Sequence, residues 1–286
     1  MSVKIIVDSA ADLGVGFAER NGIGFAPLKT ILAGTEYRDG IDMTPDVFYN
    51  KLKANKELAS TSQVSVAEFA DLFAKAVESG DEVVAITLSG GLSGTCQSAT
   101  LAAADFPGKV FVVDSLNATA GEQVLVARAI ALRDEGKSAA EIFAELQELK
   151  KHVKLFVRVE TLEYLKRGGR ISKTAAFVGG MLHFMPVLTL NGEGKLETVG
   201  KARGAKLSHK MLNDSIVAAG GIDFSMPVVI TYAGELNDGV LDAYLADSKE
   251  IYAGNEEKLM IGQLGCVIGT HTGPGAIVVA FVVKGN

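Results

Sequence analysis

The sequence has two cysteines and no tryptophan among its 286 residues. Cys96 and Cys266 are too few for a disulfide framework and lack a C-x-x-C spacing, so we expect two buried small side chains. No apolar run approaches the roughly 20 residues that cross a bilayer. The first residues enter a predicted strand without the pattern of a signal peptide. The sequence therefore predicts a cytoplasmic protein.

A basic surface is also missing. The chain carries 28 lysines and arginines against 34 acidic residues, and its net charge is −6. This balance argues against a nucleic-acid partner. The four histidines share no metal-ligand spacing, and the glycine clusters match neither a dinucleotide fingerprint nor a P-loop. We expect no metal, no cofactor and no nucleotide bound by this chain alone.

The segment from Val83 to Thr100 is the most informative one. Val83 to Leu88 has the composition of a buried strand, the next three residues break it, and a helix is predicted from Leu92 onward. The free N–H groups at the start of that helix, around Ser93 to Cys96, favour an anion. Ser93 has a second interpretation, in which it only caps its own helix.

The first half alternates strands with helices, which predicts a mostly parallel sheet covered on both faces, a three-layer α/β/α domain. Its ligand loops are expected at the carboxyl ends of the strands. The predicted strands are Lys4 to Val7, Ile23 to Leu28, Val83 to Leu88 and Val110 to Val113, with a further strand at Leu155 to Val159. The loops expected at that edge carry Ser9, Thr61, Ser93 and Ser115.

Leu58 to Ser65 is a polar segment that precedes a predicted helix. Ser65 and Glu68 have the spacing of a capping box, which leaves Thr61 and Ser62 without a local role. These two hydroxyls either face a ligand or are ordinary loop residues.

The second half has a different pattern, typical of an α+β domain with an antiparallel sheet. A hairpin is predicted from Val187 to Lys201, and later strands at Pro227 to Tyr232, Lys258 to Leu264 and Ala276 to Val283. His271 falls in a predicted turn between the last two strands. We place a domain boundary near Glu160, giving domains 1–160 and 161–286 with a crevice between them.

Four motifs resemble the DegV family of bacterial fatty-acid-binding proteins. They are Thr61 to Ser65, Ser89 to Thr95, Leu165 to Ile171 and His271 to Ala276. The resemblance extends from Asp8 to the final strand and therefore covers essentially the whole chain.

This resemblance implies a two-domain fold that holds one long-chain fatty acid, of the palmitate or oleate class, between the domains. It places the carboxylate at Thr61, Ser93 and His271, with Ser62 and Gly94 beside them. It also implies a lipid-binding subunit rather than an enzyme, in bacterial phospholipid metabolism with transient membrane contact. An ATP-using fatty acid kinase subunit would convert the bound carboxylate to an acyl phosphate. Residues matching the family's partner-binding or phosphate-binding arginines are Arg170 and Arg203.

Three positions depart from the family pattern. Val64 stands where proline is common, and Gly204 follows Arg203 where threonine is usual. Met181 to Pro186 replaces a segment with asparagine and lysine before the proline, and we expect it to line the acyl tunnel.

Two other functions fit parts of the sequence. A serine hydrolase or acyltransferase would use Ser93 as nucleophile and His271 as base, although no acidic third member is identifiable and the nucleophile-elbow glycines are incomplete. A binder of a phosphorylated metabolite would use the same helix start.

Overall fold

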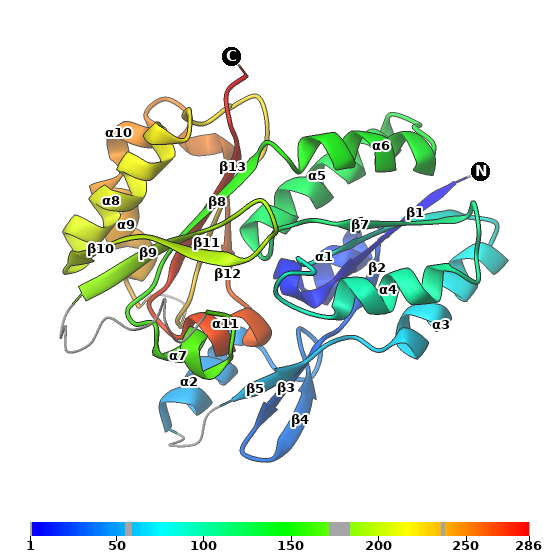
Figure 1. Ribbon diagram of the computed structural model, residues 1–286, viewed down its shortest axis with the longest axis horizontal. Helices are drawn as coiled ribbons and strands as arrows, with labels where there is room; N and C mark the ends of the chain where they lie inside the picture. Colours follow the sequence, from blue (N-terminus) through cyan, green and yellow to red (C-terminus); the bar gives the residue numbers. More distant parts are fainter. Residues whose placement is uncertain (1, 55–58, 172–183, 236–237, 286) are drawn as a thin grey trace.

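Three β-sheets form the frame of the molecule (Figure 1). The computed structural model describes residues 2–54, 59–171, 184–235 and 238–285. A four-stranded and a six-stranded sheet lie next to each other, and a three-stranded sheet lies at the lower edge of the view. Across the described ranges, no helix is both long enough and apolar enough to cross a membrane.

The four-stranded sheet is parallel throughout, in the order β2-β1-β6-β7. Its strands are β1 (Val3–Asp8), β2 (Gly24–Ala26), β6 (Glu82–Thr87) and β7 (Val110–Asp114). Helices α3 (Val66–Glu78) and α4 (Thr95–Ala103) cover one face, and α5 (Ala120–Asp134) and α6 (Ala139–Leu149) cover the other. Because both faces are covered, the strand Val83 to Ile86 is fully buried. The predicted three-layer α/β/α arrangement is confirmed.

Local capping explains where two of these helices begin. The Ser65 hydroxyl accepts the N–H of Glu68, whose carboxylate accepts the N–H of Ser65, and Ser138 and Glu141 repeat this arrangement before α6. The capping box predicted at Ser65 is confirmed.

The six-stranded sheet has the order β10-β9-β8-β13-β11-β12. Its strands are β8 (Val153–Arg158), β9 (Phe184–Leu190), β10 (Leu196–Arg203), β11 (Val228–Tyr232), β12 (Leu259–Gln263) and β13 (Ile277–Val282). The pairings are antiparallel, as predicted, except that β11 and β12 are parallel. A helical crossover through α9 (Val240–Asp247), α10 (Lys249–Tyr252) and the short η2 (Glu256–Lys258) permits that parallel pair. Strand β8 belongs to this sheet, although the expected boundary near Glu160 assigns it to the first domain.

Helix α5 lies in the seam between the two large sheets. It contacts β1 and β6 of one sheet and β8, β11 and β13 of the other. Residues 120–126 are therefore all buried, and the helix has no exposed side along this stretch. Helix α8 (Ala205–Ala218) covers the outer face of the six-stranded sheet.

The three-stranded sheet was not predicted. It consists of β3 (Lys29–Leu32), β4 (Thr35–Arg38) and β5 (Ser60–Ser62), in the order β4-β3-β5. The predicted strand Ile23 to Leu28 is shorter and ends before Pro27, and the segment expected as a loop contains β5. Ala33 and Gly34 both adopt positive φ and turn the chain back between β3 and β4.

A helix also replaces the turn that was predicted around His271. Helix α11 (Cys266–Thr272) contacts β3, β5, α2 (Pro45–Ala54), α7 (Glu163–Arg167) and the 3₁₀ turn η1 (Ser9–Ala11). At its start, the N–H of Gly265 donates to Asp12 (2.9 Å) and the N–H of Cys266 donates to Asp39 (3.0 Å). These bonds join the end of the chain to its beginning, where α1 (Gly14–Arg20) follows Asp12.

The β9–β10 hairpin reaches back to the four-stranded sheet. The Ser89 hydroxyl donates to the carbonyl oxygen of Gly194 at the hairpin tip (2.8 Å). Gly91 lies so close to the tip that a Cβ there would be 2.6 Å from the Glu193 carbonyl oxygen. The hairpin therefore rests on the glycine turn that follows β6.

We predict that Gly91→Ala lowers the free energy of unfolding by about 1–3 kcal/mol, the range for overpacking against a backbone that cannot retract freely. Gly192→Ala is the matched control, because a Cβ on this tip residue would meet nothing within 4 Å. Denaturant unfolding of both variants measures the difference. Equal stability of the two variants would contradict the contact.

Candidate functional site

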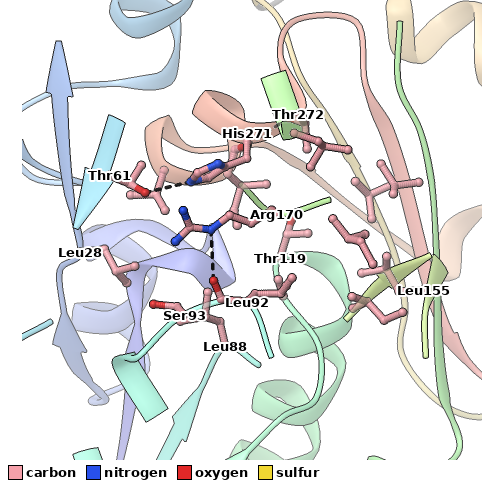
Figure 2. A pocket seen from close by; sticks show the side chains of 18 of the residues that line it. Leu28, Thr61, Leu88, Leu92, Ser93, Thr119, Leu155, Arg170, His271 and Thr272 are labelled. Carbon is pink, nitrogen blue, oxygen red and sulfur yellow. Dashed lines mark hydrogen bonds between the residues drawn. The ribbon is translucent and has the colours of Figure 1, made fainter. Parts of the chain in front are cut away.

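A largely apolar cavity lies between the two large sheets (Figure 2). About 740 Å³ of space in it, counting the open solvent at its mouth, is not filled by protein atoms. Twelve of its twenty described lining residues are aliphatic: Leu28, Leu88, Leu92, Ala118, Leu155, Val157, Leu165, Leu190, Leu196, Val267, Ile268 and Val278. The polar lining residues are Thr61, Ser62, Gln63, Ser93, Thr119, Arg170, His271 and Thr272.

Two carboxylates hold the loop that follows β6 at the cavity wall. Asp8, at the end of β1, accepts the N–H of Leu88 (2.8 Å), and Asp114, at the end of β7, accepts the N–H of Gly90 (3.2 Å). Complete burial raises the pKa of Asp8 to about 7, against the lowering effect of its backbone hydrogen bonds. The loop is thus fixed from both neighbouring strands.

Ser93 lies on this loop, two residues before α4 begins. Ser93 lines the cavity, and its hydroxyl accepts the N–H of Thr95 (3.3 Å) and bonds the Thr95 hydroxyl (3.0 Å). Ser93 therefore contacts the helix start and is also part of the cavity lining. Gly94 is the N-cap residue but does not line the cavity, and a Cβ there would collide with Gln63.

Thr61 and His271 meet at one end of the cavity. The Thr61 hydroxyl and His271 Nε2 are 2.8 Å apart, which joins β5 to the last turn of α11 (Figure 2). Ser62 follows on β5 and also lines the cavity. Gly168 lets His271 approach, because a Cβ at this position would collide with the imidazole Nδ1.

The His271 imidazole is neutral at physiological pH. Burial, and then the nearby Arg170 charge, lower the pKa of His271 to about 4. Its Nδ1 atom is buried and has no hydrogen-bond partner among the described residues. A neutral imidazole can donate one hydrogen bond without adding a fixed positive charge.

Arg170 belongs to the wall of the cavity. Its Nε donates to the Leu92 carbonyl oxygen (3.1 Å) and its Nη1 to that of Gly168 (2.6 Å). Burial lowers the pKa of the guanidinium group. Arg203 ends β10 as an exposed residue and is not among the residues lining the cavity.

The structure brings together Thr61, Ser62, Ser93, Arg170 and His271 and leaves Gly94 and Arg203 outside the lining. The expected tunnel segment Met181 to Pro186 lies partly outside the described residues. Ser9 and Ser115 have structural bonds instead, to the N–H of Leu28 and to Asn117.

Sequence reasoning missed most of the apolar lining. Leu155 and Val157 lie two residues apart on β8 and so face the same side, and this alternation was the available signal. Val267 and Ile268 gave no signal, because their segment was not recognised as a helix.

The arrangement does not form a serine-hydrolase triad within the described residues. Ser93 bonds Thr95, and His271 bonds Thr61 through Nε2 while its Nδ1 lacks an acidic partner. Nor do the described residues include a group of three side chains suited to a metal ion.

The comparisons with known proteins all lead to the same family. A family model described as "Uncharacterised protein, DegV family" matches residues 2–284. A DegV domain-containing protein from Deinococcus radiodurans is 35% identical over 283 residues, covering 98% of both chains. Fatty acid binding is described for a Thermus thermophilus DegV family structure (37% identity, TM-score 0.86, covering 99% of this chain and 100% of that one). A stearic-acid-binding protein from Eubacterium ventriosum has 28% identity, a TM-score of 0.84 and 99% coverage of both chains.

We predict that His271 stays neutral in NMR titrations until the pH falls well below the ordinary imidazole value of 6.5, with a midpoint of about 4. Because this pKa is lowered, the contribution of His271 to stability is present above pH 6.5 and is lost as the pH falls through 4. Absence of one signal in His271→Gln assigns the resonance. A midpoint near 6.5 in lipid-free protein would contradict the burial argument.

Proposed function

Because this chain belongs to the DegV family, we propose that it binds a long-chain fatty acid, of the palmitate or oleate class, in the cavity between its two large sheets. The supporting observation is the polarity of the lining, which is aliphatic over most of its extent and bears uncharged donors at one end. Relatives described as fatty-acid-binding proteins share the fold over nearly the whole chain.

The acyl chain supplies the affinity in this proposal. Burying about 14 methylenes at about 0.8 kcal/mol each gives on the order of 10 kcal/mol before the costs of association. Residues from the loop after β6, from β8 and from α11 provide the apolar contacts, among them Leu88, Val157 and Ile268.

In this proposal the carboxylate of the fatty acid lies at Thr61, Ser93 and His271, with Ser62 next to them. An anion taken out of water costs several kcal/mol unless donors receive it. The hydroxyls and the neutral imidazole meet this need, and the Arg170 charge behind them adds a longer-range attraction.

The chain would then present this carboxylate to an ATP-using kinase subunit. A carboxylate oxygen attacks the γ-phosphorus of the partner's ATP, the bond from that phosphorus to the ADP oxygen breaks, and acyl phosphate and ADP leave. The role of this chain is to bind and position, so it is a subunit of a kinase system in phospholipid metabolism. Arg170 and Arg203 are the proposed partner contacts. Use of ATP fits a cytoplasmic location.

The other two candidates fit the geometry less well. A hydrolase needs Ser93 bonded to His271, whereas each has a different partner. A small phosphorylated metabolite would leave the long aliphatic lining without a function.

We predict that protein purified from cells releases fatty acid on denaturing extraction, detected by mass spectrometry. Calorimetric titration of delipidated protein with palmitate should show Ser93→Ala weakening binding by about 1.5–3 kcal/mol, roughly 10- to 150-fold, for one hydrogen bond to a charged group. Thr100→Ala is the control, because it removes an exposed hydroxyl from α4, the helix that follows Ser93. Preparations that carry no lipid and bind neither palmitate nor oleate would refute the proposal.

We also predict that Arg170→Gln lowers acyl-phosphate formation with the kinase subunit by a larger factor than it weakens palmitate binding. The guanidinium bonds two backbone carbonyls rather than a cavity hydroxyl, so its loss leaves the apolar contacts intact. Turnover and palmitate Kd measured on the same preparation give the two factors. Equal losses would assign Arg170 to ligand binding alone.

A further inference from the structure

A second depression lies next to the end of the cavity where Thr61 and His271 meet. Thr61, Arg170 and His271 line the apolar cavity and also line this second depression, here called the outer chamber. This chamber encloses about 650 Å³ of empty space including its mouth. Its described lining consists of Ala59, Ser60, Thr61, Tyr164, Arg167, Gly168, Arg170, Thr270 and His271.

The charge of the outer chamber is of one sign. Arg167 and Arg170 line it, and no aspartate or glutamate is among its described lining residues. Arg170 is partly buried and forms no ion pair with a described carboxylate, although the chain carries more acidic than basic residues. A desolvated guanidinium without a counterion favours an anion beside it.

Both arginines retain free donors. Arg170 uses Nε and one Nη1 proton on backbone carbonyls. Arg167 pairs with Glu163 through Nε, and no bond is formed by its Nη groups with described residues. Since a guanidinium has five N–H donors in a planar fork, each arginine can still bond two oxygens of one anion.

Hydroxyls complete the donor set. Ser60 and Tyr164 line the chamber, and neither side-chain hydroxyl forms a hydrogen bond with another described residue. Thr270 differs, because its hydroxyl proton is given to the Cys266 carbonyl oxygen (2.7 Å). This supply of donors exceeds what one carboxylate requires and suits three phosphoryl oxygens.

We propose that the outer chamber binds a phosphoryl dianion joined to the fatty acid's carboxyl group, with Arg167 as a phosphoryl contact in addition to Arg170. This inference rests on the proposed function, because it requires the carboxyl group to lie at Thr61 and His271. Because Thr61, Arg170 and His271 line both spaces, a phosphoryl group attached there is adjacent to the outer chamber.

The test compares two ligands by calorimetry at pH 8, where the phosphonate is doubly charged. One is palmitate, and the other is the palmitoyl phosphate analogue in which a CH₂ group replaces the bridging oxygen. Arg167→Gln should weaken analogue binding by about tenfold, the effect of one charge-assisted hydrogen bond, and leave palmitate binding nearly unchanged. Lys166→Gln is the matched control, because it removes one positive charge from an exposed neighbour on α7 that does not line the chamber.

Each outcome decides between the two proposals. A loss of analogue affinity in Arg167→Gln, with palmitate binding retained, supports the chamber. If palmitate binds but Arg167→Gln and Lys166→Gln weaken the analogue equally, the chamber assignment is wrong and the proposed function stands. If neither ligand binds, both are wrong. Binding of ATP that competes with the analogue and depends on Arg167 would overturn the acyl-linked assignment in favour of a nucleotide phosphate.

Discussion

The site depends on two carboxylates that hold the start of α11. Asp12 and Asp39 accept the N–H groups of Gly265 and Cys266, more than 220 positions later in the chain. Burial raises the pKa of both acids, and their mutual repulsion raises that of Asp12 further. The helix dipole favours negative charge at this end. One turn and a half later, the same helix carries His271 against Thr61, so the position of the imidazole follows from a bond made at the opposite end of α11.

The two ends of the cavity have different roles in ligand binding. Strands β8 and β13 and helix α11 contribute aliphatic side chains, whose burial is not directional and tolerates a flexible occupant. The hydroxyls and the imidazole come instead from a short strand, a glycine turn and a helix end, each fixed by backbone hydrogen bonds. Affinity can therefore come from one end of the cavity and orientation from the other.

How much of this the sequence predicts depends on the range of the deciding contacts. The buried strand Val83 to Ile86 and the capping box at Ser65 are local patterns, and both were predicted. Strand β5 has only three residues, all polar, and forms because β3 offers it a pairing edge. Helix α11 contains β-branched residues and a glycine, so its stability comes from tertiary contacts that a local pattern does not contain. The hydroxyl residues at strand ends were thus predictable as candidates, whereas the helix carrying His271 was not.

The roles of single glycines and of the charged residues also depend on contacts between distant parts of the chain, so the sequence alone does not predict them. The sequence displays Gly91 and Gly168, but not that one must admit a hairpin tip and the other an imidazole ring. The sequence also contains 34 acidic residues, but it does not show which surfaces of the folded protein lack them. No described acidic residue lines the cavity or the outer chamber, and the carboxylates nearest to the loops are used up as acceptors of backbone N–H groups. An acidic chain that keeps its carboxylates out of both spaces leaves Arg170 without a permanent counterion, and this is the electrostatic condition for an anion that comes and goes.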